Sequence, residues 1–294
     1  MIIKTKTFNT AALAAVLIAN PALGGENNLP GGGAMIADDG GAAAAGATTS
    51  ESEDLAKKMQ NPIASLISVP FQNNFDFGAG PEGDGFQWKM TIQPVVPIDL
   101  NEDWNLIWRT ILPMIYQEDV AGTTALPSGS QTGLGDTQMS FFFSPKKPTS
   151  NGLIWGVGPA LSFPTATDEL LGSEKWAAGP SVIALKQSNG WTYGVLANHL
   201  WSFAGDDGRD DVNNTFIQPF LSYTTKNSTS FGINTESSYN WNAEQWTVPI
   251  NATVSKLVKF GSQPVQFQFG VRWYAEAPDN GPDWGLRLGA TLLF

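Results

Sequence analysis

The chain has 294 residues, a formal net charge of -11, no cysteine and one histidine. The missing cysteine excludes a disulfide framework, thiol catalysis and thiolate metal sites, and a single histidine argues against a zinc centre. The negative charge argues against nucleic acid as a partner, and no apolar run reaches the roughly eighteen residues of a membrane-spanning helix.

The N-terminus has the pattern of a secretory signal peptide. Lys4 and Lys6 precede the apolar run Ala11–Ala19, and residues 21–24 provide a small-residue cleavage site. We therefore expect residues 1–24 to be removed on export. The alternative, a membrane anchor, would require a longer apolar span, and without cysteine the chain cannot be a lipoprotein.

Residues 25–62 are predicted to form a Gly/Ala-rich linker that ends in a short helix. The helix is expected within residues 51–62, where Leu55 and Met59 are four residues apart and Pro62 ends the pattern.

From residue 63 onward the apolar residues recur with period two, which is typical of β-strands. In residues 86–93, for example, Phe86 and Trp88 alternate with Gln87 and Lys89. The pattern predicts about twelve strands, which begin near Ile63, Phe86, Trp104, Gly133, Leu153, Trp176, Trp191, Thr215, Ser230, Gln245, Pro264 and Asp283.

Two further features favour a membrane barrel over a soluble β-sandwich, which would also alternate. The second face of the strands carries small and polar residues with few long charged side chains, and aromatic residues mark the strand ends. These are the lumen face and the aromatic girdles of an outer-membrane barrel.

The connections give an independent test, because they alternate between short and long. Lysines gather on the side of the short connections and acidic residues on the side of the long ones. We therefore predict an all-β, antiparallel up-and-down transmembrane β-barrel over residues 63–294, located in the bacterial outer membrane. The short helix could lie in the barrel mouth as a plug or outside in the periplasm, and the second placement is favoured.

Several short strings carry a family resemblance, among them "GLGDTQ" (residues 133–138), "WTYGVLANHLWSFAG" (191–205) and "GPDWGLRL" (281–288). Together they resemble bacterial outer-membrane proteins labelled transporter-like or "neuromedin U", close to the barrels named for the meta-pathway of phenol degradation. The resemblance spans about residues 63–294. It implies a β-barrel with a transport role and gives no catalytic residues and no established substrate.

Enzymatic activity is not expected. The rival would be an outer-membrane phospholipase, but His199 and Ser202 are three residues apart and point to opposite faces of a regular strand. The acidic run Asp206–Asp211 lacks the ligand spacing of a calcium loop and is interpreted as a solvated outer loop, bridged to lipopolysaccharide by divalent cations.

Charged residues inside strands are the candidate site, because facing lipid would cost them about 2–4 kcal/mol at the midplane. The alternation of inward and outward residues along each strand predicts that six charged side chains face the lumen: Lys89, Arg109, Asp136, Glu236, Arg272 and Arg287. The four basic residues would form one wall across the seam of the barrel. The wall could line a conducting path, or the charges could fill a closed lumen as salt bridges, such as Glu236 with Arg272 or Asp136 with Arg109.

The chain ends on an apolar stripe that resembles the signal read by the outer-membrane assembly machinery, formed by Leu288, Ala290, Leu292 and Phe294. The predicted function is a channel for passive passage of small anionic or aromatic solutes, with no cofactor and with membrane lipid and lipopolysaccharide as surroundings. The alternative is a plugged structural or adhesive barrel without transport.

Overall fold

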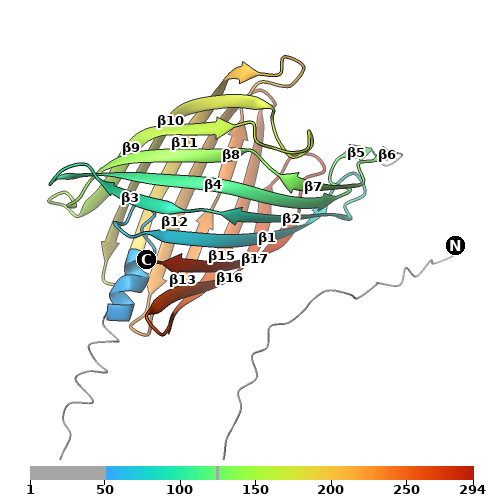
Figure 1. The fold of residues 1–294 in the computed structure, drawn as a ribbon. Coiled ribbons are helices and arrows are strands. Elements are labelled where there is room, and N and C mark those ends of the chain that lie inside the picture. Colours follow the sequence, from blue (N-terminus) through green and yellow to red (C-terminus); the bar gives the residue numbers. More distant parts are fainter. Residues whose placement is uncertain (1–50, 124–125) are drawn as a thin grey trace, which may run out of the picture. The chain divides into compact units, whose positions relative to one another are not determined.

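A computed structural model describes residues 51–123 and 126–294. The expected signal peptide and most of the expected linker lie outside this range. The described chain is nearly all β-strand, with one helix over residues 51–58 (Figure 1). No helix in the described residues is long and apolar enough to cross a membrane.

Seventeen strand segments are present in the described ranges, and Figure 1 shows their order. They are β1 (Ser68–Ala79), β2 (Gly85–Ile92), β3 (Val95–Asp99), β4 (Trp104–Glu118), β5 (Gly122–Thr123), β6 (Leu126–Pro127), β7 (Ser130–Leu134), β8 (Thr137–Pro145), β9 (Leu153–Phe163), β10 (Lys175–Ser188), β11 (Trp191–Gly205), β12 (Asn213–Thr224), β13 (Thr229–Thr235), β14 (Ser237–Asn240), β15 (Gln245–Phe260), β16 (Gln263–Glu276) and β17 (Trp284–Leu293).

These segments form a closed antiparallel barrel of twelve strands, which confirms the predicted fold. Three barrel strands consist of two segments each, namely β2 with β3, β7 with β8, and β13 with β14, while the β5–β6 hairpin lies apart from the barrel sheet. Sequential neighbours pair along the wall, and β1 closes the barrel on β17, with Phe71 opposite Ala290. Closure leaves no free sheet edge, which a barrel in lipid requires.

A proline lies in or opposite each of the three strand breaks, and it has no N–H to donate to a neighbouring strand. The first break contains Pro94 itself, and β2 and β3 keep one register against β4 on either side of it. Gly135 donates to the carbonyl of Pro113 at the second break, and Glu236 to that of Pro249 at the third. The register of the chain against β4 shifts by one residue between β7 and β8, as at a β-bulge.

The two faces of the wall differ in the way that period two predicts. On β16 the outward side chains of Phe269, Val271 and Trp273 are 49%, 49% and 60% exposed. The inward side chains of Arg272 on β16 and Asn251 on β15 are 7% and 0% exposed. A contiguous apolar exterior of this kind suits hydrocarbon and not water, so the barrel is an outer-membrane protein.

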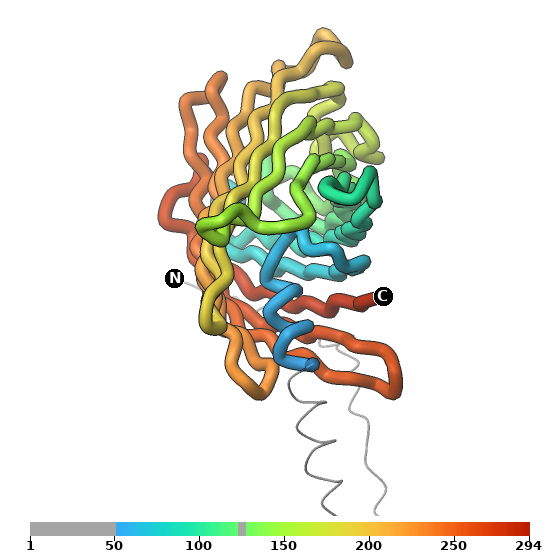
Figure 2. Tube along the Cα trace, turned by 90° about the vertical axis from the view of Figure 1, so that its left-hand side faces the viewer, coloured from blue at the N-terminus to red at the C-terminus, as the bar shows by residue number. Residues whose placement is uncertain are grey.

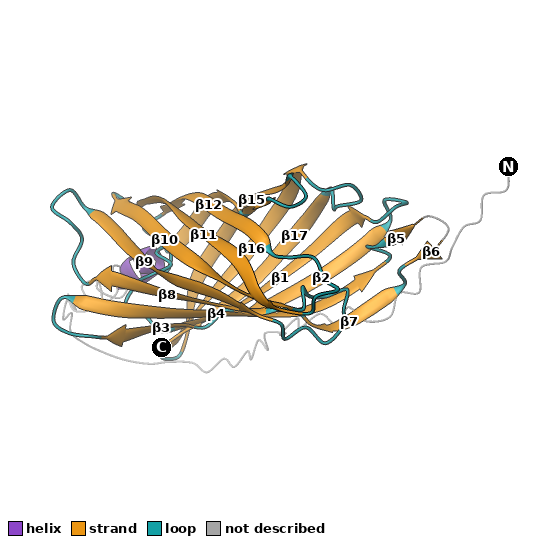
Figure 3. Ribbon diagram, turned by 90° about the horizontal axis from the view of Figure 1, so that it is seen from above, coloured by secondary structure: helices purple, strands orange, loops and turns teal. Residues whose placement is uncertain are grey.

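The connections differ in length at the two ends, as predicted. At one end lie residues 100–103, 146–152, 189–190, 225–228 and 261–262. At the other lie residues 80–84, 119–123 and 126–129, 164–174, 206–212, 241–244 and 277–283. Figure 3 shows the barrel from above with these connections at its two ends. By the rule for outer-membrane barrels the end with the shorter turns is periplasmic.

The helix and the residues after it fill the periplasmic end of the lumen, so the favoured placement outside the barrel was wrong. Ala56 is fully buried against Leu257 and Leu293, whose side chains point inward. Gln187 donates to the backbone carbonyl of Lys57 at 2.8 Å. Figure 2 shows the helix at the end of the barrel, near the C-terminus. The sequence pattern predicts the helix itself but does not predict the apolar surface inside the barrel against which the helix packs.

A second apolar contact extends this plug across the lumen. Ile63 is 4% exposed and packs in a cluster of inward side chains from β4, β8, β10 and β11, namely Ile107, Phe142, Ile183, Leu185 and Leu196. Asn105 donates to Ser65 at 2.8 Å. We call residues 51–67 the plug segment. β1 begins directly after it, five residues later than the strand start expected at Ile63.

Candidate lumen site

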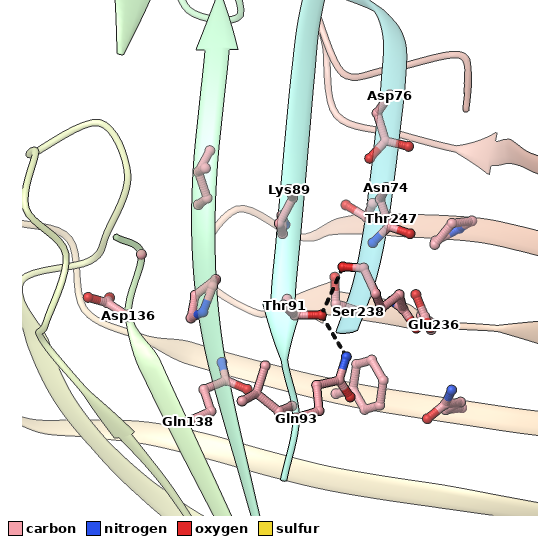
Figure 4. Close-up of a pocket in the computed structure, with 18 of the residues that line it drawn as sticks. Asn74, Asp76, Lys89, Thr91, Gln93, Asp136, Gln138, Glu236, Ser238 and Thr247 are labelled. Atoms are coloured by element: carbon pink, nitrogen blue, oxygen red, sulfur yellow. Dashed lines mark hydrogen bonds between the residues drawn. The ribbon is translucent and has the colours of Figure 1, made fainter. Parts of the chain in front are cut away.

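A polar cavity of about 520 Å³ lies in the lumen, in the half of the barrel away from the plug segment (Figure 4). Its lining includes five of the six charged residues expected to face the lumen: Lys89, Arg109, Asp136, Glu236 and Arg272. Asp136 and Glu236 lie at two of the strand breaks, and Gln93, beside Pro94, lies at the third. The three strand breaks therefore lie at the level of the cavity.

Glu236 is the centre of a charge cluster. Its carboxylate accepts two hydrogen bonds from Arg287, with Nη1 2.9 Å from Oε1 and Nη2 2.7 Å from Oε2. Arg272 lies on the other side, with Nη1 3.4 Å from Oε2. A bidentate pair of this kind is both strong and geometrically specific. The Glu236–Arg272 salt bridge that was considered from the sequence is therefore present.

Arg287 differs from the other expected residues, because it lies in the wall behind the cavity lining. It is 2% exposed, and its Nε donates to Asn74 Oδ1 at 2.8 Å. Arg272 is held by two further groups, Tyr274 Oη at 2.9 Å and Asp76. Arg272 Nε is 3.1 Å from Asp76 Oδ1, an ion pair without the alignment of a hydrogen bond.

Asp76 and Asn74 belong to the charge cluster but were not predicted from the sequence. They lie on β1 between the basic residues of β2 and those of β16 and β17, and Figure 4 shows both beside the cavity. The sequence does contain the alternating pattern of a barrel strand here, since Gln72, Asn74 and Asp76 alternate with Phe71, Phe75 and Phe77. Applying the same parity rule to β1 would have placed Asp76 inside.

Lys89 and Arg109 have no ion pair within 4 Å in the part of the chain that the structure describes. Arg109 Nη2 donates to Gln93 Oε1 at 2.7 Å. Four basic side chains (Lys89, Arg109, Arg272 and Arg287) thus lie around Glu236 and Asp76, and with Asp136, which lines the same cavity, the formal net charge of these seven residues is +1.

Asp136 has a structural role and does not pair with Arg109. Its Oδ2 accepts hydrogen bonds from the backbone N–H and the hydroxyl of Ser173, both at 2.7 Å, and its Oδ1 accepts from Ala166 N at 3.2 Å. The carboxylate thereby ties the outer connection of residues 164–174 to the wall. The salt bridge of Asp136 with Arg109 that was considered from the sequence does not form.

His199 lies on the outer face of β11, as its parity indicates. Its Nδ1 is 2.7 Å from Thr215 Oγ1, its Nε2 is 3.1 Å from Asn213 Oδ1, and its ring lies against Trp201 at 3.9 Å between centroids. Ser202 does not contact it: the Ser202 hydroxyl donates to Asp211 Oδ1 at 3.0 Å.

Comparison with solved structures supports the fold. The barrel is similar to an outer membrane channel from Pseudomonas putida F1, with a TM-score of 0.60, 17% identity, and coverage of 78% of this chain and 94% of that one. The β domain of the Bordetella autotransporter BrkA aligns with a TM-score of 0.44 and 8% identity over 78% of this chain and 100% of that one. Escherichia coli outer membrane phospholipase A aligns with a TM-score of 0.43 and 9% identity over 77% and 92%.

At the sequence level, no protein-family model matches the chain, and a search of curated proteins gives no match. The structural comparison therefore supports membership of the outer-membrane barrels as a fold. The finer resemblance to the "neuromedin U"-labelled family depends on its short motifs alone.

Proposed function

We propose that the protein is an outer-membrane channel through which small polar solutes pass passively, with a preference for anions. The observation that carries the proposal is that Lys89 and Arg109 line the 520 Å³ lumen cavity without an ion pair in the described chain, within a charge cluster of formal net charge +1. Charged side chains in a pore lining set its ion selectivity, and here the two lining charges without an ion pair are both basic, which favours anions. The motifs that resemble a transporter-like family support the same role.

The mechanism needs no cofactor and no catalytic residue. Arg272 and Arg287 fix Glu236 in the wall by direct contacts, while Lys89 and Arg109 leave positive charge directed at the cavity. A solute anion is attracted to this charge and loses part of its hydration to the polar lining. Contact with lipopolysaccharide belongs to the acidic outer loops, through divalent cations.

One observation favours a second function, that of a plugged structural barrel. The plug segment buries Ala56 and Ile63 in apolar contacts at the periplasmic end. If this contact never opens, the lumen carries no current, and the outer loops then perform the function of the protein.

Planar-bilayer recording in a salt gradient tests the channel proposal. We expect the wild-type protein to conduct with anion preference, and Arg272→Ala combined with Arg287→Ala to lower that preference. Lys89→Gln is a less disruptive test, because the substitution breaks no ion pair. We expect it to lower the anion-to-cation permeability ratio about fivefold, which corresponds to a loss of ~1 kcal/mol of attraction for the anion.

Lys147→Gln, on an exposed periplasmic turn, is the matched control and should leave selectivity unchanged. Unchanged selectivity in both lumen variants would contradict the assigned role of the cluster. Absence of conductance in the wild type and every variant would favour the plugged barrel.

A further inference from the structure

A second cavity, of about 240 Å³, lies between the plug segment and the barrel wall. It shares four lining residues with the larger cavity: Gln72, Gln93, Arg109 and Gln218. We call these four residues the neck, because both cavities meet there. A solute that passes from the larger cavity to the smaller one passes Arg109.

Arg109 offers unused hydrogen-bond donors at the neck. A guanidinium has five N–H donors, and in the described residues only the bond to Gln93 Oε1 is present. Gln93 is itself held in orientation, since its Nε2 donates to Thr91 Oγ1 at 2.7 Å. The nearby carboxylate of Glu236 is already engaged by Arg272 and Arg287. The planar guanidinium is suited to bind a carboxylate in bidentate fashion.

Carboxamides form the other side of the second cavity. Gln266 and Gln268 project from β16, and Gln266 is 8% exposed with no hydrogen-bond partner for its Nε2. An unpaired buried donor is destabilising, and a ligand oxygen in the cavity would satisfy it. Each carboxamide provides both donors and an acceptor, which matches hydroxyl groups and does not match an aromatic ring.

We propose that the second cavity is a binding site for a small hydroxylated carboxylate. The carboxylate binds Arg109 at the neck, and the hydroxyl groups bind Gln266 and Gln268. This inference rests on the proposed channel function and names its solute class: it selects hydroxylated acids over aromatic acids and over uncharged sugars.

Isothermal titration calorimetry on the detergent-solubilised full-length protein tests the site without requiring transport. The probes are gluconate, benzoate and glucose. We expect gluconate to bind at least tenfold more tightly than either of the others. Arg109→Gln should weaken gluconate binding about tenfold or more, Arg109→Lys should weaken it less, and Lys147→Gln should leave it unchanged.

Gln266→Leu provides a second variant that keeps the charge. It should weaken gluconate and leave benzoate unchanged, which a general loss of structure would not do. Benzoate binding as tight as gluconate, or full gluconate affinity in Arg109→Gln, would overturn the proposal.

Chloride conductance of the same preparations separates this inference from the channel proposal. Conductance with no gluconate binding overturns the binding site and leaves the channel. Gluconate binding with the expected variant pattern but no conductance keeps the site and overturns the channel.

Discussion

Arg287 and Glu236 join two parts of the barrel wall that are not neighbours in the sheet. Arg287 lies on β17, Glu236 lies in the break between β13 and β14, and β15 and β16 separate them. Two hydrogen bonds of 2.9 and 2.7 Å nevertheless connect the side chains. The barrel is therefore braced inside its lumen as well as by its sheet.

Glu236→Gln should both destabilise the barrel and raise its anion preference. The change leaves two buried arginines without their shared carboxylate, and breaking a buried pair from one side costs about 3–5 kcal/mol. Urea unfolding followed by tryptophan fluorescence measures the loss, and bilayer recording measures the selectivity. Glu244→Gln on an exposed outer turn is the control. Stability equal to that of the control would show that the brace contributes nothing.

Ile63→Ala should loosen the plug segment. The side chain is 4% exposed within an apolar cluster, and such a truncation costs roughly 2–5 kcal/mol. We expect larger single-channel conductance and faster thiol labelling of a cysteine placed at Met59. Ile67→Ala, where the side chain is 40% exposed, should change neither quantity. Unaltered conductance together with faster labelling would mean that the plug segment does not limit the current.

Deletion of Phe294 should impair assembly. Phe294 follows β17, is 65% exposed, and its backbone N–H donates to Ile67 O at 2.9 Å. The expected result is less heat-modifiable folded barrel in membrane fractions. Phe260→Ala removes an aromatic ring of similar exposure, 58%, at the same end of the barrel and should assemble normally. Equal yields of the two variants would remove the assembly role from the terminal residue.

The Asp211 carboxylate should stay ionised at lower pH than an ordinary aspartate. In the outer connection of residues 206–212, hydrogen bonds from Lys175 and Ser202 lower the pKa of Asp211 below 3.8. Because the folded pKa is depressed, the contact is fully present above pH 3.8 and is lost as pH falls through the folded value. Carboxyl ¹³C chemical shifts measure the midpoint, and Lys175→Gln should move it upward. A midpoint unaffected by that substitution would contradict the assigned cause.

Much of the barrel could be predicted from the sequence, because lipid and lumen impose opposite requirements on alternate residues. Trp273 and Arg272 show the rule: adjacent in sequence, they are 60% and 7% exposed. The alternation of short and long connections supplied the orientation. The alternation of residues and the lengths of the connections are local features, so they can be recognised in a single sequence.

The contacts across the lumen could not be predicted in the same way. Parity places Asp136 and Arg109 inside, but only the path of residues 164–174 makes Ser173 the partner of Asp136. The position of the helix likewise depends on Leu257 and Leu293 forming an apolar surface together. Such pairings depend on strands far apart in the sequence, and the period of a single strand contains no information on them.

The seam between β1 and β17 runs through the charge cluster, which links function to the order of assembly. Asn74 and Asp76 come from the first strand and Arg287 from the last, so the cluster is incomplete until the two ends of the barrel meet. A half-closed intermediate would hold Arg287 at membrane depth without Asn74, an unfavourable arrangement that joining the seam relieves. Two of the basic residues in the proposed anion path, Arg272 and Arg287, thus also contact the first strand and help to hold the closed seam together.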